Sequence, residues 1–340
     1  MAALASPSFA QSTVTVYGLA DLGVDLQRGG AAGTIRKVSS GMQNGSRLGF
    51  KGTEDLGSGL AAVFVMEMGI AMDTGSLNQG GLAWGRQIYT GLRSDAGTLT
   101  LGRQYTALNN ALCGDIDPFS CGLAGTAGNL MSVGGTPTNG GNGSRTNNAI
   151  KYASPTLAGV KGELTYAPGE LSGSSRAGRT LGGSLGYGVG ALTLRLAYND
   201  VVNPTDTSVA KVAFVGAKFD AGPVVVAIGY AVNKAAFSAN NNISNPDSRD
   251  LLAGVTVPLG AGSLMASYIK KSDKAGSNDA NQVAVGYTHA LSKRTNLYTS
   301  YAKIHNTAPN TDATAFYRVG NAIDGGTGNS ALNLGIRHSF

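Results

Sequence analysis

The segment Thr13–Gln27 alternates between two kinds of residue for most of its length. Val, Leu, Gly and Ala fill every second position from Val14 to Leu26, while Asp21 and Asp25 lie at positions between them. A period of two places the two sets on opposite faces of a β-strand. A tilted strand of about 9–11 residues crosses a lipid bilayer. The alternation therefore predicts a strand with one apolar and one polar face, long enough to span a membrane.

The same alternation recurs along the chain. It is found in Ser46–Leu56, Val160–Tyr166, Ala191–Tyr198 and Ala331–Phe340. The last of these segments ends the chain on an aromatic residue, as a strand ending at a membrane–water interface would. We therefore expect an all-β chain whose strands each present one face to hydrocarbon.

The composition supports this interpretation. Charged residues make up 14% of the chain, and 51 of the 340 residues are Gly, whereas soluble domains carry roughly 25% charged residues. The mean hydropathy is −0.01, and no apolar run of about 18 residues could form a membrane-spanning helix. A soluble β-sandwich also shows a period of two, but its outer faces would be charged.

Short Gly-rich turns give the number of strands, because Gly supplies the positive φ that tight hairpins need. Seven such turns follow one another at Asp55–Gly59, Ser94–Gly97, Pro155–Gly159, Gly186–Gly190, Asp220–Pro223, Pro258–Gly262 and Leu291–Arg294. Alternating with eight longer loops, they predict sixteen antiparallel strands. A repeat of this spacing also occurs in solenoids and propellers, but the alternation of short turns with long loops favours an up-and-down barrel with its short turns on the periplasmic side.

One connection is much longer than the others. The stretch Thr106–Thr146 is rich in Gly, Asn and Thr and contains the chain's two cysteines, Cys113 and Cys121. Loops of this length are usually functional, and this one could lie over the mouth of the barrel or inside it. We expect it to fold into the lumen, as a constriction loop that sets the width of a pore.

The N-terminus indicates export. Residues 1–10 end in Ser8-Phe9-Ala10, a small-x-small cleavage pattern, so we interpret them as a signal-peptide remnant and 11–340 as a single barrel domain. In an exported protein Cys113 and Cys121 should form a disulfide; two free thiols are the alternative.

The charges and motifs argue against other classes of protein. The net charge is +6, but Lys and Arg are scattered rather than clustered, so we expect no nucleic acid partner. The residues His289, His305 and His338 match no metal-ligand spacing, so we expect no metal and no cofactor. The sequence contains no GxxxxGK or HExxH motif, so no enzymatic site is predicted.

Six short motifs resemble one family. They are QSTVTVYG at Gln11–Gly18, SRLGFKGTEDL at Ser46–Leu56, LGRQY at Leu101–Tyr105, NAIKYASP at Asn148–Pro155, LSKRT at Leu291–Thr295 and GIRHSF at Gly335–Phe340. Together they are similar to the trimeric general porins of beta-proteobacteria. The resemblance implies a sixteen-stranded homotrimer in the outer membrane, in contact with lipid and lipopolysaccharide. It also implies an infolded third loop whose acidic residues face a cluster of arginines and favour small anionic solutes.

The family's arginines can be placed on this sequence. Matching motifs make Arg47 and Arg145 the candidates, and the alternation puts both on the inward face together with Lys51 and Lys151. The third is Arg86, although the alternation over Arg86–Arg93 brings Arg86 inward only through a bulge or near the loop.

Two positions in this region stay open. The family's third arginine could be absent and replaced by Gln87, and Arg103 could face the lumen or a subunit contact.

Within the long loop, Asp115 and Asp117 are the only acidic residues. We expect a transverse field from Arg47, Arg86, Arg145 and Lys151 toward them, since a close pair attracts by about 4 kcal/mol at an effective dielectric constant near 20. Solvated loop acids or turn caps are the alternative, as Asp-Pro often initiates a turn.

The sequence thus predicts passive diffusion of small hydrophilic solutes with a preference for anions. Two other functions fit a barrel of this kind. A barrel enzyme would need a catalytic trio on neighbouring strand ends, and a plugged adhesin would bind through loops such as Asn240–Asp247 and Asn306–Ser330.

Overall fold

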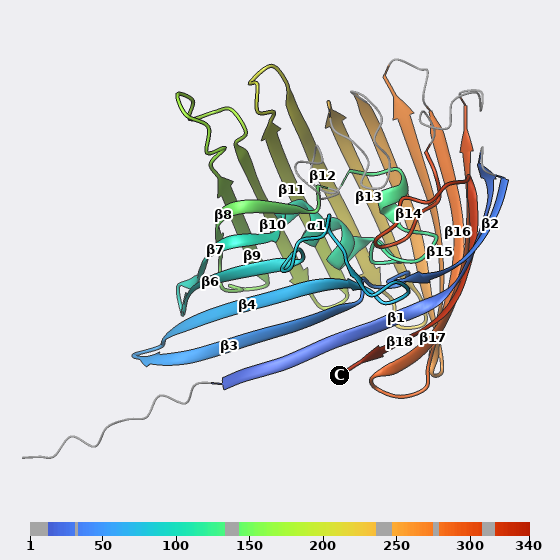
Figure 1. Cartoon of the computed structure of the whole chain (residues 1–340), viewed down its shortest axis with the longest axis horizontal. Helices are drawn as coiled ribbons and strands as arrows, with labels where there is room; N and C mark the ends of the chain where they lie inside the picture. Colours follow the sequence, from blue (N-terminus) through green and yellow to red (C-terminus); the bar gives the residue numbers. More distant parts are fainter. Residues whose placement is uncertain (1–12, 31–32, 133–142, 236–246, 275–278, 308–316) are drawn as a thin grey trace, which may run out of the picture.

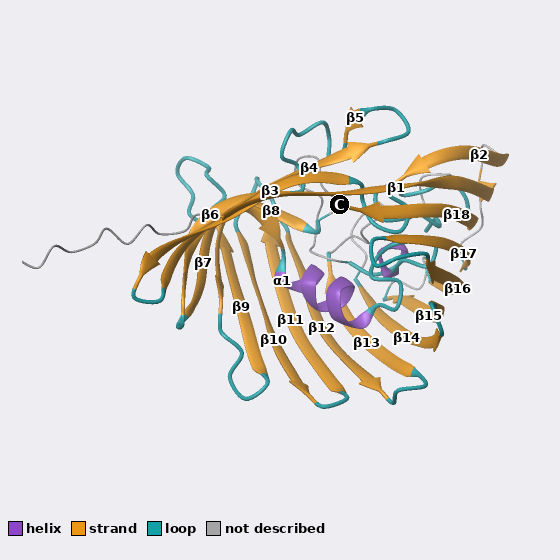
Figure 2. Cartoon of the chain, turned by 90° about the horizontal axis from the view of Figure 1, so that it is seen from below, coloured by secondary structure: helices purple, strands orange, loops and turns teal. Residues whose placement is uncertain are grey.

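The computed structural model describes residues 13–30, 33–132, 143–235, 247–274, 279–307 and 317–340. The expected signal-peptide remnant lies outside these ranges. The described chain forms a closed antiparallel barrel (Figures 1 and 2). No described helix is both long and apolar enough to cross a membrane.

The strands follow one another in sequence order around the wall. Their bounds are β1 Thr13–Gly30, β2 Gly33–Ser40, β3 Arg47–Gly57, β4 Leu60–Ala71, β5 Ser76–Leu77, β6 Gln87–Ser94, β7 Gly97–Tyr105, β8 Arg145–Ala153, β9 Val160–Ala167, β10 Thr180–Val189, β11 Leu192–Val202, β12 Val209–Asp220, β13 Val225–Lys234, β14 Ser248–Leu259, β15 Gly262–Asp273, β16 Ala280–Ala290, β17 Thr295–Asn306 and β18 Ser330–Ser339. Between β7 and β8 lie the short helix α1 (Ala107–Asn109), a π-helical segment (Asn110–Ile116) and a 3₁₀ turn (Ala127–Asn129).

The wall has sixteen strand positions, as the turns predicted. Both β2 and β3 pair with β1, at Leu22↔Ser40 and Leu19↔Arg47, so together they occupy one interrupted position. The two-residue strand β5 pairs only with the end of β4. Pairing of β1 with β18 closes the ring, from Leu19↔Ser339 to Arg28↔Ser330.

All seven short turns fall between strands as expected, but the first of the eight long loops does not exist. Only residues 31 and 32 separate β1 from β2. The alternation did not predict β2, because its segment GTIRKVSS lacks a clear apolar face. Pairing with the long strand β1 makes it a strand.

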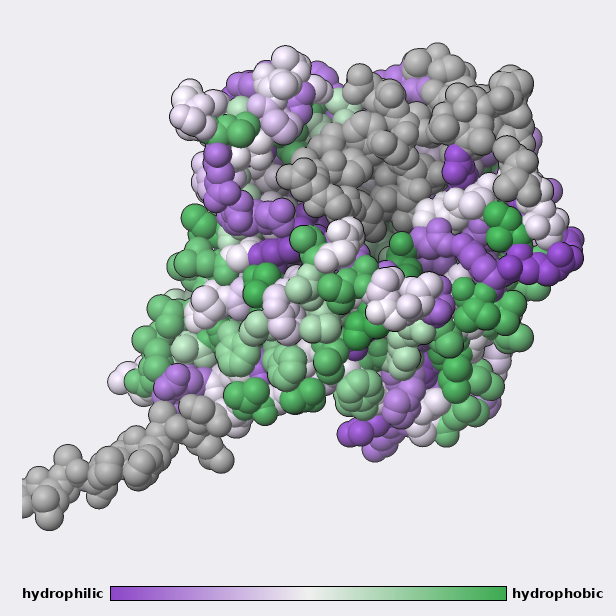
Figure 3. Space-filling model, in the orientation of Figure 1, coloured by the Kyte–Doolittle hydropathy of each residue, from purple (hydrophilic) through white to green (hydrophobic). Residues whose placement is uncertain are grey.

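The two faces of the wall have opposite character. Val14 and Val16 are 65% and 57% exposed on the outside, whereas Asp21 and Asp25 are 0% and 1% exposed on the inside. Apolar residues cover much of the barrel's outer surface (Figure 3). The alternation of Thr13–Gln27 therefore does separate an outward face from an inward one.

Part of the inner face of the wall is covered by loop three. The described residues of loop three, 106–132 and 143–144, lie inside the ring of strands (Figure 2), and their apolar side chains pack on the inner face of the later strands. Wall glycines make the room: a Cβ at Gly216 would lie 2.6 Å from Ile116 Cγ1, and one at Gly254 would lie 2.3 Å from Pro118 Cγ. The inner face of this half of the wall is therefore covered by loop three, which buries its own apolar residues there.

Candidate functional site

Loop three is held in shape by its own polar groups. The hydroxyl of Thr106 accepts a hydrogen bond from the Asn109 N–H, 3.1 Å, and caps α1. At the far end, the Asp117 carboxylate accepts from the N–H groups of Phe119, Cys121 and Ala127, at 2.9–3.1 Å. These bonds fold residues 117–127 into a closed ring.

A disulfide joins Cys121 of this ring to Cys113 in the preceding helical segment, with 5.0 Å between the two Cα atoms. It agrees with the prediction made from export. Asp117 is 5% exposed, and burial raises the pKa of its carboxyl to about 6, while the three N–H bonds oppose that rise. Asp117 thus accepts hydrogen bonds from the loop's own backbone and does not line the cavity with the arginines. This corresponds to the turn-cap alternative.

Polar contacts attach loop three to the opposite wall. The side chain of Gln282 on β16 donates to the Gly125 carbonyl, 3.0 Å, and accepts from Asn129, 2.7 Å. The Ser300 hydroxyl on β17 accepts from the Ala124 N–H, 3.1 Å. On the other side of the loop, a cavity is lined by residues at the starts of β3 and β8 and just before β6.

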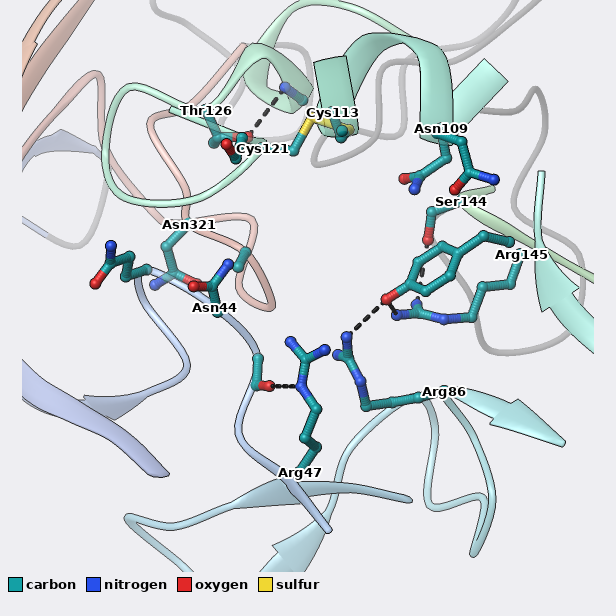
Figure 4. A pocket seen from close by; sticks show the side chains of 18 residues that line it. Asn44, Arg47, Arg86, Asn109, Cys113, Cys121, Thr126, Ser144, Arg145 and Asn321 are labelled. Carbon is teal, nitrogen blue, oxygen red and sulfur yellow. Dashed lines mark hydrogen bonds between the residues drawn. A yellow bond between two sulfur atoms is a disulfide. The ribbon is translucent and has the colours of Figure 1, made fainter. Parts of the chain in front are cut away.

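Three arginines lie on that wall. Arg47 is the first residue of β3, Arg86 immediately precedes β6, and Arg145 is the first residue of β8. All three line a cavity of about 320 Å³ (Figure 4). Because Arg86 lies before its strand begins, the alternation of β6 does not constrain its direction. This explains how it reaches the lumen, and Gln87 does not take its place in the cavity lining.

Tyr105, the last residue of β7, holds two of these arginines together. Its hydroxyl accepts a hydrogen bond from Arg86 Nη2 at 2.6 Å and another from Arg145 Nη2. The Arg145 guanidinium carbon also lies 4.2 Å from the centre of the Tyr105 ring. A shared acceptor and the negative ring face both reduce the repulsion between two like charges.

One carboxylate balances part of this charge. Glu67 on β4 is 3% exposed; its Oε1 lies 2.7 Å from Arg86 Nε and its Oε2 lies 3.8 Å from Arg47 Nη1. The Tyr17 hydroxyl donates to Glu67 Oε2, 3.0 Å. Three guanidinium groups against one carboxylate leave a formal charge of +2 at the site.

The opposite side of the cavity is neutral. It is formed by side chains and backbone of Asn44, Asn109, Asn110, Thr126, Asn321 and the disulfide. None of the described residues that line this cavity is acidic. Figure 4 shows Arg47 and Arg86 pointing across the opening toward the disulfide and Thr126.

The other loop acid is paired elsewhere. Asp115 Oδ2 lies 2.6 Å from Nε of Arg195 on β11, so the expected field from the arginine cluster to the loop acids is not what the structure has. The reason is tertiary: the helical segment of loop three runs along β11–β13, and Arg195 is the cation it meets there.

The two lysines lie apart from the cluster. Lys151 Nζ is 2.9 Å from Glu163 Oε2, and that carboxylate also accepts from Asn110 in loop three, 3.1 Å. Lys51 lies 5.4 Å from the centre of the Tyr17 ring, below the arginine level. Neither lines the cavity with the arginines.

Arg103 lies beside a β-bulge in β7, between Gly102 and Gln104. It is 8% exposed and donates to the Gly85 carbonyl, 2.8 Å, and to the Asn147 side chain. Both partners belong to neighbouring segments of the same chain, and Arg103 does not line the cavity of the arginine cluster.

Four residues of the site were not predicted from the sequence: Tyr17, Glu67, Tyr105 and Arg195. For Glu67 a signal was present, since it is the only charge in the apolar strand LAAVFVMEMGIA. A single charge in an otherwise apolar segment is costly unless it is paired. In the described residues no three His, Cys, Asp or Glu side chains come together as a metal site.

Comparisons with known proteins agree with this geometry. Residues 1–309 match the Gram-negative porin family. An outer membrane porin protein of Bordetella pertussis is 30% identical over 398 residues, which cover 100% of this chain and 97% of the relative.

Solved structures share the fold. An anion-selective porin from Comamonas acidovorans matches with a TM-score of 0.79 and 28% identity, covering 97% of this chain and 100% of that one. The trimer form of OmpT from Vibrio cholerae matches with a TM-score of 0.63 and 14% identity, covering 97% and 99%; at that identity it shows the fold alone. The Bordetella and Comamonas relatives are porins, which are channels rather than enzymes. The chain therefore belongs to the Gram-negative porin family and forms a channel in the bacterial outer membrane.

Proposed function

We propose that this porin passes small hydrophilic solutes by passive diffusion and prefers anions, with Arg47, Arg86 and Arg145 as the charged side of its constriction. One observation carries the proposal: three guanidinium groups line one cavity whose facing side is neutral, and the single carboxylate paired with two of them, Glu67, is buried and does not line that cavity. A fixed formal charge of +2 attracts anions and repels cations at the narrow point of the path.

The arrangement also supports passage rather than trapping. Conduction requires sites weak enough for the ion to leave. Arg86 already donates to Glu67 and Tyr105, and Arg145 donates to Tyr105 and to Ser144, 3.2 Å. These bonds occupy two of the five N–H donors of each of these two guanidinium groups, so a passing anion meets a positive field with fewer donors available to hold it.

The test is the reversal potential of single channels in a planar bilayer with a KCl gradient. We expect an anionic sign for the unaltered protein. The double variant Arg47→Gln/Arg145→Gln should lower the chloride-to-potassium permeability ratio several-fold, because it removes two charges from the constriction. Arg176→Gln is a matched control, since Arg176 pairs with Asp206 in an exposed loop. A cation-selective protein, or an unchanged ratio in the double variant, would contradict the proposal.

We also propose that the protein is a homotrimer embedded in outer-membrane lipid and lipopolysaccharide. This follows the family resemblance and fits the apolar outer face of the wall, where Leu164 and Leu334 are 66% and 61% exposed. Light scattering of the detergent-solubilised protein should give three chains per particle, and single insertions should close in three steps. A single conductance step per particle would argue for a monomer.

The barrel carries no enzymatic activity in this proposal. Purified protein should not hydrolyse detergent esters or react with an alkylphosphonate. Ester hydrolysis without ion conduction would instead favour the barrel enzyme, and host-surface binding without conduction would favour the adhesin.

A further inference from the structure

A second cavity lies inside the barrel on the short-turn side of the arginines. Its volume is about 370 Å³. The polar residues that line it include Thr13, Thr15, Lys51, Thr53, Tyr89 and Arg93. They come from β1, β3 and β6, the same part of the wall that carries Arg47 and Arg86.

The strand register sets the level of this cavity. Lys51 is paired with Thr15 on β1 and with Val65 on β4, and Val65 is paired with Tyr89 on β6. These side chains therefore form one row around the inner wall. Arg47 lies four residues earlier on β3, which is about 13 Å away at 3.3 Å per residue.

The cavity is positively charged. Lys51 and Arg93 are both exposed in the lumen, and no carboxylate of the described residues lies within 4.0 Å of either cation. This contrasts with the upper site, where Glu67 lies between two arginines. Threonine hydroxyls around the two cations can donate hydrogen bonds to an oxyanion.

Tyr17 separates the two sites. Its hydroxyl donates to Glu67 of the arginine cluster, 3.0 Å, while its ring lies 5.4 Å from Lys51 Nζ. The ring face holds the ammonium group by a cation–π contact, and it leaves the three N–H donors of Lys51 free of any carboxylate. Tyr17 therefore lies between the arginine cluster, whose charge Glu67 partly neutralises, and the cavity with Lys51, where no carboxylate of the described residues pairs with the cations.

We propose that Lys51 and Arg93, with the surrounding threonine hydroxyls, form a second anion site on the short-turn side, suited to a divalent tetrahedral oxyanion such as inorganic phosphate. The inference rests on the proposed anion preference and adds a second station to the same path. An anion leaving the arginines toward the short turns next meets this pair of cations, so the path has two binding steps of different strength.

Two unequal stations make the channel asymmetric. Phosphate added on the short-turn side reaches Lys51 and Arg93 first and should reduce the chloride current at a lower concentration than phosphate added on the loop side. Removal of both cations should raise the half-blocking concentration from that side about tenfold, because each unit charge acts on a divalent anion through partly screened solvent.

The experiment measures phosphate block of chloride current in single oriented channels, with phosphate added first to one chamber and then to the other. The unaltered protein should show unequal half-blocking concentrations. Lys51→Gln/Arg93→Gln should make the two sides equal. The matched control is Lys161→Gln/Lys218→Gln, which removes two lysines at the short-turn ends of β9 and β12 that do not line this cavity.

Equal block from both sides in the unaltered protein would overturn the second site, and so would asymmetry that persists in Lys51→Gln/Arg93→Gln or disappears in the control. Failure of the proposed function looks different: the chloride-to-potassium ratio would not respond to Arg47→Gln/Arg145→Gln. The ratio therefore tests the arginines, and the sidedness of block tests this site.

Discussion

The hydroxyl of Tyr105 is one oxygen on which the positions of two guanidinium groups depend. Tyr105→Phe removes the acceptor used by Arg86 Nη2 and Arg145 Nη2 and keeps the ring that lies 4.2 Å from the Arg145 guanidinium carbon. Hydrogen bonds to charged groups contribute about 1.5–3 kcal/mol each in protein interiors. Water in the cavity replaces part of this, so we expect the barrel to fold and the two side chains to separate.

The effect on selectivity can be worked out from Coulomb's law. If two guanidinium groups move from about 5 Å to about 8 Å from a passing monovalent anion, the attraction at the dielectric constant of water weakens by roughly 0.6 kcal/mol in total. Since 1.4 kcal/mol corresponds to a factor of ten, the chloride-to-potassium permeability ratio should fall about threefold.

Reversal potentials of single channels in a KCl gradient measure this ratio. Tyr301→Phe is the control, because Tyr301 lies on the outer face, 44% exposed. A ratio equal to that of the unaltered protein would refute the role of the hydroxyl. A fall as large as that of the arginine double variant would mean that the phenol does more than position the cations.

Two further substitutions test the constriction from other directions. Glu67→Gln removes the carboxylate between Arg86 and Arg47, so the formal charge of the cluster rises and the anion preference should increase about twofold to tenfold; a decrease in the reversal-potential assay would contradict the charge count. Gly254→Ala places a Cβ 2.3 Å from Pro118 Cγ in loop three. Such overpacking costs about 1–3 kcal/mol, so the loop should shift and both single-channel conductance and the midpoint of thermal unfolding should change, whereas identical values would show that the loop does not need that glycine.

The sequence by itself determined the wall. An apolar residue at every second position cannot keep one face in hydrocarbon and the other in water unless the segment is a strand, so the alternation of Thr13–Gln27 already separates Val14 from Asp21. Gly-rich turns at regular spacing give sixteen strand positions. The same parity places Arg47 on the inner face, because the direction of a side chain within a strand is a local property.

Only the tertiary structure decided which charges meet. Arg86 lies just before its strand, where no periodicity applies, and it is joined to Arg145 through Tyr105 of a third strand. Asp115 is in the same loop segment as Asp117, yet one pairs with Arg195, 80 residues away, and the other caps the loop's own backbone. Contacts across a lumen depend on how an infolded loop packs against a distant wall, and that packing is set by shape, through glycines such as Gly254, rather than by any local pattern of residues.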